Sequence, residues 1–214
     1  DIPILGGITK MMTFREYSVE NDTSVSEVTI PEVEVQDKEI EEKINKIITE
    51  KVRALEEEQG IVDAEYKKAF IETGGTEETY RKIETTIGYK LHYSSDKLIS
   101  FEINKAQTLA SAYNETTYYN IDIVTGDVFT LKTVLGDDFA SFVKSDVERQ
   151  MKERMKEEVS VIYNVEYLKN NIEIDEDRKF YINDNNEIVV VFDKYEVASG
   201  ADGAQEFVVG SMEK

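Results

Sequence analysis

Apart from its carboxylates, this sequence has few residues that could do acid–base or nucleophilic chemistry. It has no cysteine and a single histidine, His92, in an alternating segment between Leu91 and Tyr93. A Ser-His-Asp site would have to use His92, yet the G-x-S-x-G motif that exposes a serine nucleophile is absent. A zinc site built from histidine and cysteine is excluded by the same inventory. We interpret His92 as a structural residue and predict no catalytic residue and no enzyme activity.

The carboxylates are abundant, but their spacing matches no ion or phosphate site. With 45 Asp and Glu residues, pairs suited to acid–base work are too common to be informative. Acidic clusters at 175–177 and 184–187 offer oxygen ligands without the D-x-[DN]-x-[DN]-G pattern of a calcium loop, and the second is typical of a turn. The glycine motifs that hold phosphates are also absent. We predict no metal and no cofactor, so binding is the default hypothesis.

The charge of the chain limits its partners. Its 25 Lys and Arg residues against 45 Asp and Glu give a net charge of −20. Such a surface repels nucleic-acid phosphates and anionic lipid headgroups, so we expect neither nucleic acid nor direct membrane adsorption. A basic protein or a cation is favoured, although many acidic proteins are merely well solvated. Residues 16–42 hold ten carboxylates and one lysine, and the common interpretation of such a run is a solvated face.

The elements that must position these groups follow from periodicity and turn residues. Period-two alternation predicts strands, and apolar residues at helical spacing predict amphipathic helices. Gly60 and the pair Gly74 and Gly75 are expected to end helices. The predicted elements are strands at 8–17 and 25–30, a helix from Asp37 to Gly60, a second helix from Val62 to Gly74, strands at 80–93, 97–109 and 112–124, a helical turn at 131–135, a helix at 138–158, a hairpin of 179–183 with 187–193, and a strand at 204–211.

The order of these elements predicts an α+β fold. We expect two small lobes in which antiparallel β-sheets pack with amphipathic helices, an N-terminal module over 1–113 and a C-terminal module over 114–214. The chain contains no run of 18 apolar residues. It begins at Asp1 and not at Met, so we expect a signal or membrane anchor upstream. The glycine-containing loop 198–205 is a candidate binding site, because glycine lets the backbone approach a partner closely.

Two segments carry a resemblance to a known family. YYNIDIVTGDVFTLKTVL at 118–135 and FYINDNNEIVVVFDKYEVASGADGAQEF at 180–207 are similar to the paired extracytoplasmic domains of RsiV-like anti-sigma factors. The resemblance spans nearly the whole chain. It implies a receptor on the extracytoplasmic face of the bacterial cell membrane. The same pair of domains accompanies peptidoglycan deacetylases, which leaves an accessory module of a cell-wall enzyme as the alternative.

The family resemblance also implies partners and site residues. In that family a cytoplasmic segment holds a sigma factor, one membrane span follows, and the outer domain recognises lysozyme, a basic protein. Binding there exposes the anti-sigma factor to signal peptidase and then to intramembrane proteolysis, which frees the sigma factor. By analogy, the partner-binding residues of this chain would be Tyr195, Ser199, Gly200 and Asp202. Family members often carry a proline and an aromatic residue where this chain has Ser199 and Gly200.

Overall fold

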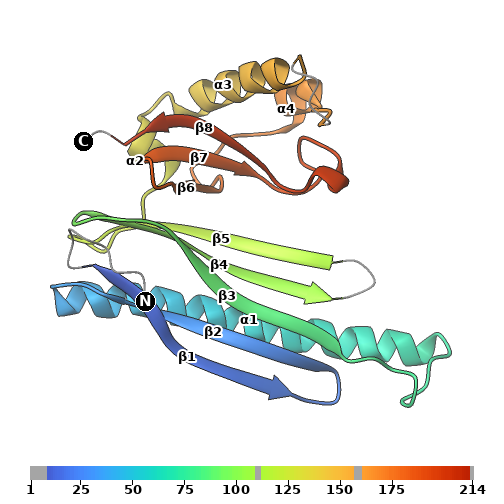
Figure 1. Cartoon of the computed structure of the whole chain (residues 1–214). Helices are drawn as coiled ribbons and strands as arrows, with labels where there is room; N and C mark the ends of the chain where they lie inside the picture. The colour runs from blue at the N-terminus through green and yellow to red at the C-terminus, as the bar shows by residue number, and fades with distance from the viewer. Residues whose placement is uncertain (1–8, 109–111, 157–160, 213–214) are drawn as a thin grey trace.

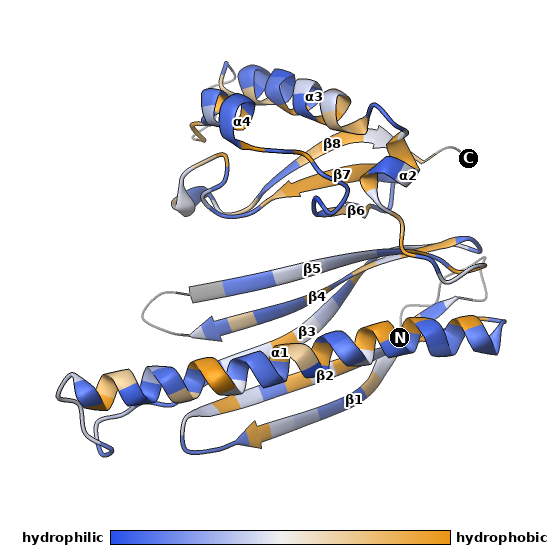
Figure 2. Ribbon diagram, turned by 180° about the vertical axis from the view of Figure 1, so that it is seen from behind, coloured by the Kyte–Doolittle hydropathy of each residue, from blue (hydrophilic) through white to orange (hydrophobic). Residues whose placement is uncertain are grey.

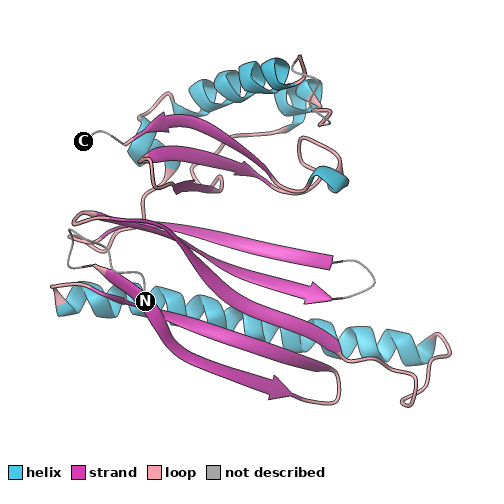
Figure 3. Cartoon of the chain, in the orientation of Figure 1, coloured by secondary structure: helices cyan, strands magenta, loops and turns pink. Residues whose placement is uncertain are grey.

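The computed structural model describes residues 9–108, 112–156 and 161–212. They form a five-stranded sheet with one long helix and a three-stranded sheet with three shorter helices (Figure 1). The three-stranded sheet lies between its helices and the five-stranded sheet, so the helices occupy the outer sides of the molecule (Figure 3). The α+β fold with two lobes, predicted from the sequence, is confirmed.

The five-stranded sheet has its strands in chain order and contains one parallel pair. Neighbouring strands are antiparallel except β2 and β3, which are parallel. The exception arises because a long helix carries the chain from one strand to the next, and such a crossover returns it in the same direction. The strands are β1 (Lys10–Glu20), β2 (Ser24–Glu34), β3 (Ile83–Ser94), β4 (Leu98–Thr108) and β5 (Ala112–Asp122).

Helix α1 (Lys38–Glu72) runs along the sheet as one continuous element (Figure 1). Asp37 caps it, because its carboxylate accepts hydrogen bonds from the backbone N–H groups of Glu39 and Ile40 at 2.9 and 3.4 Å. The predicted end at Gly60 is wrong. A glycine inside a helix costs only about 1 kcal/mol relative to alanine, and buried residues on either side of Gly60 keep the helix on the sheet.

The second lobe contains α2 (Leu131–Leu135), α3 (Phe139–Arg154), α4 (Val165–Asn171) and the antiparallel strands β6 (Phe180–Ile182), β7 (Glu187–Phe192) and β8 (Gln205–Ser211), in the order β6-β7-β8. Helix α3 ends four residues before its predicted end, and 157–158 lie outside the described residues. Helix α4 was not predicted. The predicted division at residue 113 falls near the start of β5, which pairs with β4 in the five-stranded sheet.

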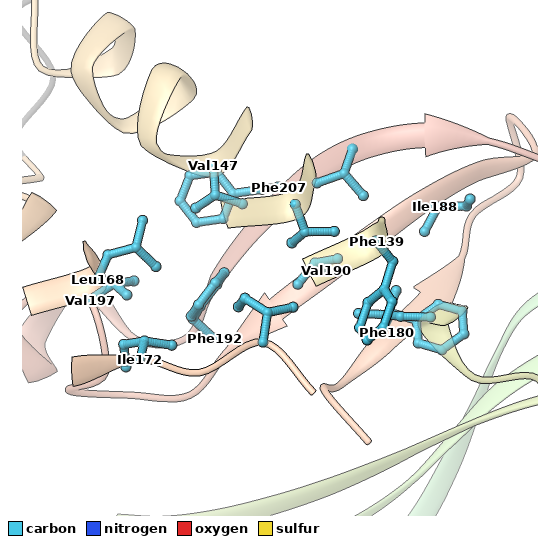
Figure 4. Packing of buried hydrophobic residues seen from close by; sticks show 14 of the residues in the cluster. Phe139, Val147, Leu168, Ile172, Phe180, Ile188, Val190, Phe192, Val197 and Phe207 are labelled. Atoms are coloured by element: carbon cyan, nitrogen blue, oxygen red, sulfur yellow. The ribbon is translucent and has the colours of Figure 1, made fainter. Parts of the chain in front are cut away.

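The core of the second lobe lies between α3 and the three-stranded sheet. Figure 4 shows Phe139 and Val147 of α3 beside Val190 and Phe207 of the sheet. Strand β7 is almost entirely apolar because both of its faces are buried, one against this core and the other toward the five-stranded sheet. Figure 2 shows this concentration of apolar residues in β7 and β8.

Hydrogen bonds and ring contacts join the two sheets. The Ser100 hydroxyl accepts a 3.0 Å hydrogen bond from the backbone N–H of Ile182, and the Asn120 side-chain amide donates to the Phe180 carbonyl at 2.9 Å. Ser100 also donates to Asn120 at 2.7 Å. All of these side chains are buried, so the bonds fix the position of β6 on the five-stranded sheet.

Candidate functional site

The four sequence-predicted site residues lie together in the loop between β7 and β8. Tyr195 has a left-handed backbone with φ of 75°, and 72% of the residue is exposed. Its ring lies on Gly200, because a Cβ added there would fall 1.9 Å from a ring carbon of Tyr195. Any larger residue at this position would displace the tyrosine. The glycine that the sequence pointed to therefore serves to seat an exposed aromatic ring.

The other two residues fix the turn of the loop. The Ser199 hydroxyl donates a 2.7 Å hydrogen bond to the Asp202 carboxylate, across the short 3-10 turn Gly200–Asp202. The Asp202 carbonyl accepts a bond of 2.8 Å from the Gln205 side-chain amide. Gly203 follows with φ of 72°, a conformation that favours glycine. The loop is thus internally bonded.

The base of the loop is anchored to the rest of the lobe. The Arg178 guanidinium donates to both carboxylate oxygens of Glu196 at 2.9 Å. Glu196 also accepts from the backbone N–H of Asp193 at 2.6 Å. Next to it, the buried Val197 accepts from the backbone N–H of Asn164 at 2.8 Å. These contacts hold Tyr195 outward on a rigid support.

The loop borders an open pocket of about 330 Å³ together with the start of α4. On the α4 side it is lined by Ile162, Asn164 and Tyr167, and Ile162 and Tyr167 are 80% and 44% exposed. We call Ile162, Tyr167 and Tyr195 the Tyr195 surface. An exposed group of large apolar and aromatic side chains is characteristic of a binding site.

The Tyr195 surface suits recognition. Tyrosine offers a rigid ring with a polar end, and the Lys194 ammonium lies 5.1 Å from the centre of the Tyr195 ring. Sequence reasoning missed Ile162 and Tyr167. The sequence did hold one signal for this helix: Asn164 is a residue type that favours the N-cap, and Ile162 and Tyr167 lie close to it in the chain. In the structure Asn164 caps α4 by accepting a hydrogen bond from the backbone N–H of Tyr167.

His92 lies elsewhere, between the two sheets. Its Nε2 atom is 2.7 Å from the Glu102 carboxylate, and its ring stacks on Tyr181 with 4.0 Å between ring centres. Burial alone would raise the pKa of Glu102, but the hydrogen bond and charge of His92 hold that pKa below its usual value. Burial raises the pKa of Tyr181, and its hydrogen bond to Glu206 raises it further. His92 thus connects the layers, as its interpretation as a structural residue expects.

The acidic clusters named from the sequence have turn geometry. Asn183 accepts from the backbone N–H groups of Asn185 and Glu187 at 3.0 Å, and Asn186 has φ of 62°. The turn interpretation of 184–187 is therefore confirmed. Within residues 9–108, 112–156 and 161–212, no group of three His, Asp or Glu side chains has the geometry of a metal site. In the same ranges no helix is long and apolar enough to cross a membrane.

Comparisons with known proteins agree with this architecture. A family model described as a protein of unknown function, DUF3298, matches residues 127–210. Two solved structures of DUF3298 proteins resemble the chain. One, from Bacteroides fragilis, has a TM-score of 0.68 and 14% sequence identity, and the match covers 97% of this chain and 95% of that one. The other, from Pseudomonas aeruginosa, has a TM-score of 0.56 and 13% identity, and the match covers 94% of this chain and 89% of that one. At these identities they show the fold alone.

A curated relative extends the relationship to a regulatory protein. The chain is 31% identical over 215 residues to the anti-sigma-V factor RsiV of Bacillus subtilis, which covers 97% of this chain and 70% of that protein. The similarity includes both lobes and the loop that carries Tyr195. It indicates a regulatory domain, and the chain belongs to the RsiV family of anti-sigma factors.

Proposed function

We propose that this chain is the extracytoplasmic ligand-sensing domain of an anti-sigma factor, and that its Tyr195 surface binds a lysozyme-like basic protein. The observation that carries the proposal is the exposure of Tyr195 on a loop whose base and turn are both held by hydrogen bonds. An aromatic residue held in this way gains contact area with little loss of conformational entropy.

The charge of the chain supports a basic partner. At −20, the domain attracts a cationic protein over long distances, which raises its association rate by about 10-fold to 1,000-fold at low salt. Steering alone does not give a long-lived complex, which requires a fitted and desolvated centre. The Tyr195 surface supplies that centre, and the acidic surface supplies the steering.

The proposed regulatory consequence rests on what the family resemblance implies. The ligand binds outside the cell and makes the protein a substrate for signal peptidase and then for intramembrane proteolysis. A sigma factor held by a cytoplasmic segment is thereby released. In this proposal the membrane anchor lies upstream of Asp1, and the domain acts by being recognised.

Calorimetry and co-elution with purified lysozyme at moderate salt test the proposal. We expect binding by the wild-type chain and loss of most of it in Tyr195→Ala, mainly through faster dissociation, because a central aromatic contact is removed. Asp202→Lys should act in the same direction. Tyr66→Ala is the matched control, since Tyr66 is also exposed but lies on α1. No heat and no co-elution at tens of micromolar would remove lysozyme as the ligand.

A further inference from the structure

The edge strand β1 carries an exposed phenylalanine beside helix α1. Phe14 is 66% exposed and lies at a bulge, where the register with β2 shifts between Thr13 and Arg15. A bulge redirects a side chain away from the regular alternation of a strand. Phe14 and Pro31 line an open groove of about 430 Å³ against the first turns of α1. We call it the Phe14 groove.

Carboxylates line the Phe14 groove. Glu32, Glu41, Glu42 and Glu50 face it together with one ammonium group, that of Lys46. Lys46 is 3.7 Å from Glu50, and Glu41 is paired with Lys38. Among the residues described here, Glu32 and Glu42 form no ion pair. The groove therefore combines an apolar floor with uncompensated negative charge.

This combination is complementary to one kind of occupant. We propose that the Phe14 groove binds a cationic amphipathic peptide segment, with one large apolar side chain on Phe14 and Pro31 and with flanking Lys or Arg residues opposite Glu32 and Glu42. The carboxylates repel acidic segments, and the apolar floor excludes a purely hydrophilic cation as the best ligand.

The groove is separate from the Tyr195 surface. The first turns of α1 lie at one end of the molecule, and the loop after β7 lies at the other, as Figures 1 and 2 both show. The inference therefore goes beyond the proposed function. It assigns a second docking site on the first lobe, which a different partner or a distant part of a large partner would occupy.

A tryptophan-containing peptide tests the proposal directly. The chain has no tryptophan, so the emission of a short peptide of alternating Lys and Leu with one Trp reports only on the peptide. We expect a blue shift and saturable binding that weakens as salt rises. In a control peptide every Leu is replaced by Ser and the Trp by Tyr, and its binding is measured by calorimetry. It should bind at least about 10-fold more weakly than the Leu peptide.

Matched variants locate the site. Phe14→Ser should weaken binding about 10-fold, whereas Val124→Ser, at an equally exposed position outside the groove, should not. Glu42→Lys should weaken it severalfold, whereas Glu65→Lys, an equal charge change on the same helix, should have little effect. Thermal melting checks that each variant is folded. We expect all of them to fold, because the substituted side chains are exposed.

Three results would overturn the proposal. Equal losses in Glu42→Lys and Glu65→Lys would show diffuse attraction without a site. If Tyr195→Ala weakens peptide binding and Phe14→Ser does not, the peptide binds at the Tyr195 surface and not in the Phe14 groove. A dimer of the free chain that Phe14→Ser dissociates, seen by sedimentation together with no peptide binding, would identify a second copy as the occupant. The lysozyme experiment is independent, because the two positions expected to weaken that complex, Tyr195 and Asp202, lie on the other lobe.

Discussion

The two halves of α1 lie along the same sheet but pack against it through different kinds of side chain. Up to Leu55 the buried residues of the helix are aliphatic, whereas beyond it they are Gln59 and Asp63. Four buried polar atoms at this end have no hydrogen-bond partner among the described residues: Gln59 Oε1, Asp63 Oδ2, Thr85 Oγ1 and Gln107 Nε2. Each such atom costs roughly 1–3 kcal/mol. A continuous helix can therefore be held firmly at one end and weakly at the other.

This difference in packing between the two halves of α1 bears on where a docking site can form. The Phe14 groove is built on the firmly packed half, from Glu41 to Glu50. The weakly packed half instead exposes Ile61 and Val62, and the helix ends near Gly74. A docking surface benefits from the rigid half, because less ordering entropy is lost on binding.

The largest expected effect comes from removing an aliphatic side chain in the first half. Ile48 is fully buried, so Ile48→Ala should lower the free energy of unfolding by about 3 kcal/mol. Ile61→Ala, the same change at an exposed position in the second half, should alter it by less than about 0.5 kcal/mol. Urea unfolding followed by circular dichroism measures both values. Equal losses would show that the halves contribute alike.

Hydrogen exchange sharpens the comparison without mutation. Amides of residues 61–72 should exchange at least about 10-fold faster than those of residues 44–55, after correction for intrinsic rates, because local opening exposes little apolar surface there. Mass spectrometry of peptic fragments resolves these segments. Uniform protection along the helix would mean that the unpartnered polar groups do not weaken its second half.

A smaller effect is expected at the glycine between the halves. Beyond the adjacent residues and the backbone of the helix itself, no atom lies within 4 Å of a Cβ built on Gly60, and the backbone there is helical, so Gly60→Ala should raise the free energy of unfolding by about 1 kcal/mol. Gly74 has φ of 101°, and Gly74→Ala should lower stability by a similar amount. Denaturant titration of both variants separates helix propensity from turn strain. A loss in Gly60→Ala would indicate that the helix needs flexibility there.

The same glycine shows how far the sequence predicts the fold. Periodicity identified the strands, α3 and most of α1 correctly, because burial of one face imposes it. The end at Gly60 was wrong because glycine is a weak stop signal inside a helix that has buried residues both before and after it, here Gln59 and Asp63. The parallel pairing of β2 with β3 was not predicted, since alternation does not reveal which strands become neighbours. Helix α4 was missed because its seven residues bury only Leu168.

The candidate site was only partly readable from sequence. Tyr195, Ser199, Gly200 and Asp202 share one loop, and the family resemblance of that short segment was the basis for naming them. Ile162 lies more than thirty residues before Tyr195 in the chain, and a backbone hydrogen bond from Asn164 to Val197 connects the two sides of the pocket. Contacts of this kind depend on the tertiary fold. The Phe14 groove was likewise hidden, because it combines a bulge with a helix face.

The smallest expected effect concerns the ion pairs that join α1 to β4 and β5. Glu115 accepts from Lys51 of α1 at 3.0 Å and lies 3.1 Å from the buried ammonium of Lys105, which also approaches Glu58 at 3.8 Å. Burial alone would raise the pKa of Glu115, but these two lysines hold it below its usual value. A carboxyl group whose pKa is lowered by folding stabilises the folded state at pH values above its pKa in the unfolded chain, which is about 4.3 for Glu.

Glu115→Gln should therefore lower the free energy of unfolding at pH 7 by about 1 kcal/mol or less. The difference from wild type should shrink as the pH falls from about 5 through the folded pKa of Glu115, because the wild-type carboxyl then becomes neutral as well. Glu57→Gln, in an exposed pair with Arg53, is the control and should show almost no change. Urea titrations at several pH values measure the difference. A gap that stays constant down to pH 3 would mean that Glu115 acts through its shape and hydrogen bonds, and that charge contributes little to holding the middle of α1.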